Sequence, residues 1–201
     1  AALITNMDSP LGSAVGNSLE VIESVEILKG KTSGNLWTVC RELSCRMLML
    51  AGIGDKDECG RLVDEAVESG EALKRFEMMV KLQGGDVSYI EDTSKFRKAS
   101  FSREVYAPAD GYITHMDSEK IGLTAVLLGA GREKKDDDIN HAAGIIIAAK
   151  TGDFVKHGEL LATLFADDES RLDGAESRYL SAVSIGDKSL GEQPMILDYI
   201  D

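Results

Sequence analysis

Two stretches of the sequence combine residue types and spacings that could bind an ion. The first is Leu128-Gly-Ala-Gly-Arg132, which follows a predicted strand. Its backbone amides and the Arg132 guanidinium could hold an anion, because Gly129 and Gly131 leave the amides uncovered. The alternative, which we favour, is a tight turn at the strand end where the glycines let two backbones approach closely. The third glycine of a G-x-G-x-x-G dinucleotide motif is missing.

The second stretch is Leu11-Gly-Ser-Ala14 together with Glu23. Glu23 lies four residues after Leu19, at the edge of the apolar stripe of a predicted helix, so its carboxylate needs a partner. The preceding loop supplies backbone carbonyls, and carbonyl oxygens with one carboxylate suit a hard cation. A salt bridge from Glu23 to a lysine is the commoner arrangement and remains an alternative.

Other residues with chemical potential do not form a catalytic or metal-binding pattern. The histidines lack the i, i+4 partner of a helical metal site, and Asp136-Asp-Asp138 lacks the alternation of a calcium loop. We therefore interpret them as solvated or structural residues. The histidines are His115, His141 and His157.

The sequence has three cysteines, none of them in C-x-x-C spacing. They therefore indicate neither a complete disulfide framework nor a zinc site. Cys40 and Cys45 lie on a strongly apolar predicted helix, where cysteine behaves as a small hydrophobic residue. Cys59 lies on the inward face of the next predicted helix. This usage is typical of a reducing compartment, and we expect the protein to be cytoplasmic.

The composition argues against several classes of partner. The chain has 201 residues, with 22 Lys and Arg against 35 Asp and Glu and a net charge of −13. This charge argues against binding to nucleic acid or an anionic membrane, because both need clustered cations. No apolar run approaches the roughly 18–20 residues of a membrane span.

Apolar spacing predicts that the first 90 residues are helical after one short strand. The strand is Ala2–Thr5, and the helices are 14–29, 35–51, 56–69 and 71–83. The helix over 35–51 is apolar over so much of its surface that we expect it to be buried on most sides.

From Phe101 onward the sequence is rich in β-branched residues, glycine and turns. A polar connector at 91–101 separates two predicted domains, 1–95 and 96–201. We therefore predict an α+β protein whose N-terminal strand and helices precede a β-rich module. The predicted strands of that module are 103–107, 111–115, 124–128, 144–149, 160–165 and 194–200, with a last helix over 168–183.

Four stretches follow longer patterns, in order along essentially the whole chain. Residues 4–23 approximate T-D-M-x-x-P-L-G-x-x-V-G-N-A-L-E-V-x-E, with Asn6 in place of the usual Asp. The others are F-x-x-M-V-x-x-Q-G-G at 76–85, L-G-A-G-R-x-x-K-D-D-x-I at 128–139 and G-D-x-V-x-x-G-x-x-L at 152–161. Together they resemble the pyrimidine-nucleoside phosphorylases, the family that includes thymidine phosphorylase.

The resemblance implies a pentosyltransferase of pyrimidine salvage. In this reaction phosphate attacks C1′ of a pyrimidine nucleoside, and the free base and pentose 1-phosphate result. Members are homodimers in which a small helical domain and a large mixed α/β domain enclose the active site. Residues 1–95 would then be the C-terminal part of the large α/β domain, and 96–201 the C-terminal β-rich domain.

The resemblance also implies a monovalent cation site, usually for potassium, formed by the backbone carbonyls of Leu11 and Ala14 and the carboxylate of Glu23. It implies no organic cofactor. The family's phosphate loop, K-x-S-T-G-G, and its base-binding Arg, Ser and Lys have no counterpart in the sequence. We therefore expect a C-terminal fragment without catalytic residues, with an incomplete potassium site, monomeric and inactive on its own. The alternative is a standalone, non-catalytic binding or scaffold module.

Gly111-Tyr-Ile and 152–161 also resemble the two halves of lipoyl and biotinyl carrier domains, which implies a barrel-sandwich hybrid for the β-rich module. In carriers, the modified lysine lies on a hairpin shortly after the second half. No lysine occurs between Leu164 and Ser170, so we expect no covalently bound carrier group.

Overall fold

The computed structural model describes residues 1–200 except 133, 190 and 192. Its contacts divide the chain into two compact units that alternate along the sequence. The first unit comprises Ala1–Thr5, Ile22–Lys95 and Met195–Asp201, and the second comprises Asn6–Val21 and Phe96–Pro194. The assignment of 1–95 and 96–201 to two domains stays a prediction.

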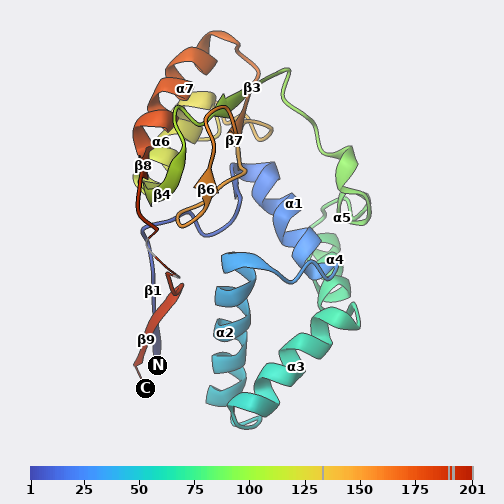
Figure 1. The fold of residues 1–201 in the computed structure, drawn as a ribbon. Helices are drawn as coiled ribbons and strands as arrows, with labels where there is room; N and C mark the ends of the chain where they lie inside the picture. The colour runs from blue at the N-terminus through green and yellow to red at the C-terminus, as the bar shows by residue number, and fades with distance from the viewer. Residues whose placement is uncertain (133, 190, 192, 201) are drawn as a thin grey trace. The chain divides into compact units, whose positions relative to one another are not determined.

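The first unit is mainly helical, with one two-stranded sheet. Strands β1 (Ala2–Thr5) and β9 (Ile196–Ile200) pair antiparallel, so the two ends of the chain lie side by side (Figure 1). The helices follow the spacing that the sequence indicates. They are α2 (Gly34–Leu50), α3 (Lys56–Glu68), α4 (Glu71–Leu82), the short α5 (Ser88–Glu91) and a 3₁₀ turn, η1 (Thr93–Lys95), while α1 (Asn17–Leu28) begins in the second unit and continues into the first.

Local chemistry fixes where α3 begins and which face it turns to α2. The Asp55 side chain accepts a hydrogen bond from the amide of Glu58 at 2.9 Å and so caps the first turn of α3. Arg41 of α2 binds Asp64 of α3 through two nitrogens, each at 2.6 Å. This bidentate pair fixes the register between the two helices.

The expectation that the helix over 35–51 is buried on most sides is wrong for this structure. Only three residues of α2 are buried, and one of them is the polar Glu42. Leu43, Met47 and Leu50 are 44 %, 63 % and 70 % exposed. The apolar surface that predicts burial therefore forms an open face.

The second unit consists of two antiparallel sheets and a helix pair. One sheet has the order β2-β5-β7-β3 and the other β6-β4-β8. Helices α6 (Ser118–Leu128) and α7 (Ser170–Ala182) pack side by side (Figure 1). The strands are β2 (Ala14–Val15), β3 (Phe101–Tyr106), β4 (Gly111–Met116), β5 (Gly144–Ile147), β6 (Phe154–Val155), β7 (Leu160–Ala166) and β8 (Val183–Gly186).

The strand predicted over 124–128 is wrong, because these residues form the second half of α6. Asp117 caps the helix by accepting from the amide of Lys120 at 3.0 Å, and Gly129 ends it with φ 106°. The buried positions recur at helical spacing: Ile121, Thr124, Ala125 and Leu128. The fold class, α+β, is confirmed, and both sheets of the second unit are open in the described part of the chain.

Candidate functional site

The loop that carries two of the predicted cation ligands is attached to the edge of β5. The Ser13 carbonyl accepts a hydrogen bond from the amide of Ile147 at 2.7 Å, and Ala14 pairs with Ile146. Lys150, which follows β5, donates from Nζ to the carbonyls of Pro10 and Leu11, both at 3.2 Å. Backbone pairing and one ammonium therefore hold the loop together.

Two glycines allow this attachment. A Cβ on Gly16 would lie 2.5 Å from the carbonyl oxygen of Ala143, and a Cβ on Gly144 would lie 2.3 Å from that of Val15. Gly16 has φ 140° and Gly144 has φ 150°, which L-residues rarely adopt. The close approach of the two segments thus requires glycine at the start of β5 and at Gly16, the residue between β2 and α1.

The predicted potassium ligands are distributed over both units. Leu11 and Ala14 belong to the second unit, whereas Glu23, in α1, belongs to the first. The carbonyl of Leu11 already accepts from the Lys150 ammonium, so the residues present do not fit an additional cation there without a rearrangement. Within the described residues, no cluster of three or more His, Cys, Asp or Glu side chains could hold a metal ion. The potassium site stays a prediction.

The glycine-rich stretch lies at the C-terminal end of a helix and not, as predicted, after a strand. Gly129 is the left-handed cap of α6, and this end of a helix carries partial negative charge, which disfavours an anion. Nε of Arg132 donates to the carbonyl of Asp137 at 3.1 Å. Gly131 borders a cavity of about 510 Å³ whose lining includes two basic residues, Lys134 and Arg171, and two acidic ones, Asp137 and Asp138. The cations of this cavity are thus matched by carboxylates, and anion binding at Gly129, Gly131 and Arg132 stays a hypothesis.

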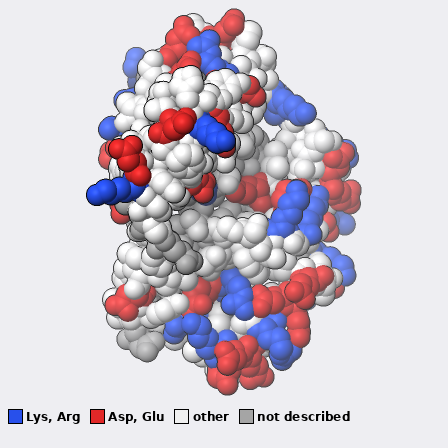
Figure 2. Space-filling view, viewed as in Figure 1, with Lys and Arg blue, Asp and Glu red and all other residues white. Residues whose placement is uncertain are grey.

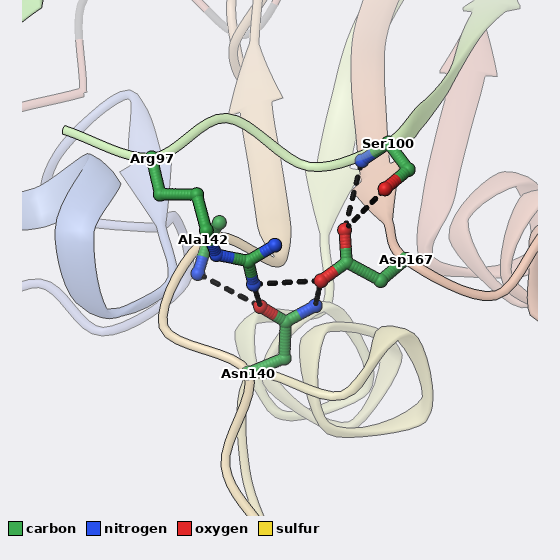
Figure 3. Close-up of polar contacts among 5 residues, drawn as sticks. All are labelled: Arg97, Ser100, Asn140, Ala142 and Asp167. Atoms are coloured by element: carbon green, nitrogen blue, oxygen red, sulfur yellow. Dashed lines mark hydrogen bonds and ion pairs between the residues drawn. The ribbon is translucent and has the colours of Figure 1, made fainter. Parts of the chain in front are cut away.

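A polar network joins three distant segments of the second unit (Figure 3). The Asn140 side chain lies between Arg97 and Asp167: its Oδ1 accepts from Arg97 at 2.5 Å, and its Nδ2 donates to Asp167 at 2.9 Å. The same Oδ1 accepts from the amide of Ala142 at 3.1 Å. Asp167 accepts from the amide and hydroxyl of Ser100 at 2.8 and 3.0 Å.

Asp167 is the electrostatic centre of this network. The Arg97 guanidinium, 2.6 Å away, and the donors of Ser100 lower the pKa of Asp167 from 3.8 to about 2. Both carboxylate oxygens and the Asn140 amide are occupied by protein partners. The network therefore fastens the segment before β3 to the end of β7 and leaves no group poised for catalysis.

The cysteines agree only in part with the interpretation made from the sequence, because Cys40, on the helix expected to be buried, is exposed. Cys45 and Cys59 are buried, and burial raises the pKa of the Cys59 thiol. Cys40 is exposed, and partial desolvation raises the pKa of its thiol too. The backbone amide of His157 donates to Asp110 at 2.6 Å in a turn. Neither Cys40 nor Cys59 has the lowered thiol pKa of a nucleophile.

Charged side chains of both signs are interspersed on the face of the molecule shown in Figure 2. Arginines pair with neighbouring carboxylates: Arg103 contacts both Asp173 and Glu176, and Arg61 pairs with Glu65 at 2.5 Å. The face drawn in Figure 2 shows no extended basic surface for a polyanion. None of the helices formed by the described residues has the length and apolar character of a membrane span.

The first unit has an apolar groove that sequence analysis did not identify. Its volume is about 680 Å³, within the range of small-molecule sites. Trp37 and Cys40 of α2 border it, as do Phe76 of α4 and residues of α1 and α3. The signal for this groove in the sequence is the wide apolar surface of α2, which we interpreted as a sign of burial.

Comparison with known proteins identifies the chain's relatives. Residues 112–186 match the family of pyrimidine nucleoside phosphorylase C-terminal domains, from the start of β4 to the end of β8. The pyrimidine-nucleoside phosphorylase of Bacillus subtilis is 40 % identical over 170 residues, which are 84 % of this chain and 39 % of the relative. That of Staphylococcus aureus (strain USA300) is 36 % identical over 187 residues, 92 % of this chain and 43 % of the relative.

The β-rich module and its helix pair thus define a phosphorylase C-terminal domain. The chain belongs to the pyrimidine-nucleoside phosphorylase family, as its motifs predict. It spans about two fifths of the length of the curated relatives that it matches.

Proposed function

We propose that this chain serves a pyrimidine-nucleoside phosphorylase, an enzyme that converts phosphate and a pyrimidine nucleoside into free base and pentose 1-phosphate. The observation that supports this is identity of 36–40 % over 84–92 % of the chain with relatives of that name. The role is in pyrimidine salvage in the cytoplasm, where its free cysteines stay reduced. Potassium and a homodimeric assembly belong to the same proposal, as properties of the complete enzyme.

The 201-residue chain by itself is proposed to be inactive. Phosphorolysis needs a phosphate-binding site made of backbone amides and cationic side chains that are not already paired with carboxylates. In the described part of the chain, the cavity lined by two basic side chains is also lined by the carboxylates of Asp137 and Asp138, so their charges offset one another. The Arg97 guanidinium is bound to Asp167. The basic side chains of this cavity and network therefore leave little unpaired positive charge to bind a phosphate dianion.

The experiment is a phosphate-dependent base-release assay with uridine and thymidine. The purified chain should release no base above a phosphate-free control. The relative from Bacillus subtilis, assayed in parallel, shows that the conditions detect phosphorolysis. Measurable turnover by the chain alone would contradict the proposed inactivity. A second assay adds a polypeptide equivalent to the part of the relatives that this chain does not match. Turnover that appears only after this addition would support the proposed role.

A non-catalytic binding module is the second candidate, and the apolar groove of the first unit favours it. A soluble globular surface seldom exposes so continuous an apolar lining. Trp37, the chain's single tryptophan, borders the groove and provides the readout. An apolar dye such as anilinonaphthalene sulfonate should bind and quench Trp37 by energy transfer, and the second candidate falls if no quenching occurs.

A further inference from the structure

We propose that Lys150 is the resident cation of the Pro10–Leu11 loop. Its ammonium takes the place that a monovalent metal ion would take at the Leu11 carbonyl, so that an ion reaches this loop only by displacing the lysine. The inference concerns the chain's own contacts and holds whether or not the chain takes part in phosphorolysis.

The geometry directs two successive carbonyls at one ammonium. Pro10 and Leu11 each accept from Nζ of Lys150 at 3.2 Å, and Pro10 is buried. These two residues are about 140 positions away from Lys150 in the sequence, so the contact closes a long loop of chain. Two carbonyl oxygens that converge on one positive charge form part of a cation site.

The lysine itself is held in place by its own turn. Its amide donates to the Asp153 carboxylate at 2.8 Å, and its carbonyl accepts from the Asp153 amide at 3.0 Å. The side chain therefore starts from a fixed backbone position in the turn that follows β5. With the backbone fixed in this way, only the side-chain torsions of Lys150 lose freedom when its ammonium binds the loop.

An ammonium and a monovalent metal ion need the same oxygen lone pairs, and two like charges at hydrogen-bonding separation repel each other. The two occupants therefore exclude one another at Leu11. Removing the positive charge of Lys150 leaves the two carbonyls without this donor and opens the position to an ion from solution.

The amide of Ile147 reports on the loop because it donates to the Ser13 carbonyl, three residues after Pro10. Its hydrogen exchange is measured by NMR at constant ionic strength in choline chloride and in potassium chloride. We expect Lys150→Met to speed exchange about tenfold in choline, as loss of a partly exposed charged hydrogen bond implies. Potassium should slow exchange in this variant and leave the unaltered chain unchanged.

The matched control is Lys156→Met, a loss of the same side chain at an exposed turn position after β6. It should exchange like the unaltered chain in both salts. The proposal is overturned if Lys150→Met exchanges at the original rate, if potassium fails to slow it, or if Lys156→Met or the unaltered chain responds as strongly.

A second measurement needs no variant and so does not depend on the folding of Lys150→Met. Amine acylation of the unaltered chain, followed by mass spectrometry, should modify Lys156 several times faster than Lys150, whose ammonium donates hydrogen bonds to two carbonyls. Equal rates at the two lysines would show that the Lys150 ammonium is not held at the loop.

Discussion

Asp167→Asn tests how strongly the polar network fastens β3 to β7. The substitution keeps the shape of the side chain and the hydrogen bonds that an amide oxygen can accept, but it removes the charge facing Arg97. The fall in the pKa of Asp167 from 3.8 to about 2 corresponds to roughly 2.4 kcal/mol at neutral pH. Because the Arg97 side chain is 61 % exposed, solvent screening reduces the expected loss to about 1–2 kcal/mol.

The sign of the pH dependence follows from the direction of the shift. The carboxylate is stabilised in the folded state, so its contribution is present above the unfolded pKa of 3.8 and is lost as pH falls towards 2. Protonated Asp167 then resembles Asn. The difference in unfolding free energy between the original chain and Asp167→Asn should therefore be constant above pH 5 and shrink below pH 4.

The assay is urea unfolding followed by circular dichroism at pH 7, 5, 4 and 3, with Asp136→Asn as the control at an exposed loop carboxylate. General acid destabilisation affects all three proteins and cancels in the difference. A difference that stays the same down to pH 3, or one shared by Asp136→Asn, would refute the assignment of the stabilisation to the Asp167 charge.

Three further substitutions or modifications follow from the packing. Tyr179→Phe should leave the urea midpoint unchanged or raise stability by about 1 kcal/mol, since the buried hydroxyl has no hydrogen-bond partner among the described residues; a clear loss would reveal a missed partner. Gly144→Ala should cost at least about 2 kcal/mol in the same unfolding assay because its Cβ would meet the Val15 carbonyl, whereas Gly122→Ala, with open space around it in α6, should be neutral or stabilising. Maleimide labelling read by mass spectrometry should modify Cys40 before the two buried cysteines, and early labelling of either buried thiol would contradict the packing of α2 on α3.

Helix α6 shows why a short apolar run can be assigned to the wrong element. Thr124 to Leu128 are β-branched or apolar, which suits a buried strand as well as a buried helix. The decisive signals lie outside the run, in the cap at Asp117 and the stop at Gly129. Considered with these caps, the segment has the length of a three-turn helix and not of a strand.

The short strands could not be predicted because their existence depends on distant partners. Ala14 and Val15 look like the start of a helix, yet β5, about 130 residues later, pairs with them. Strand β6 likewise has two residues that pair with β4. Segments of this length have too few residues to show an alternation, so the tertiary pairing alone defines them.

The polar network lies beyond sequence reasoning for the same reason. Ser100 and Asp167 are 67 positions apart, and Asn140 lies between them in the chain. No spacing rule links such residues, since each is unremarkable in its own turn. In contrast, the long helices over 34–50, 56–68 and 71–82 agree with prediction within a few residues, because their periodicity and caps are local.

The local structure of both predicted ion-binding stretches favours a cation. The glycines after Leu128 end a helix, so the backbone groups nearest to them are the last carbonyls of α6 and the field there favours cations. The carbonyls of Pro10 and Leu11 also favour a cation, and Lys150 supplies one. A glycine-rich sequence by itself does not indicate whether a loop prefers an anion or a cation. That preference depends on whether the loop lies at the N-terminal or the C-terminal end of a helix. Neither loop of this chain therefore offers the field that an anion such as phosphate needs, which is found instead at the start of a helix.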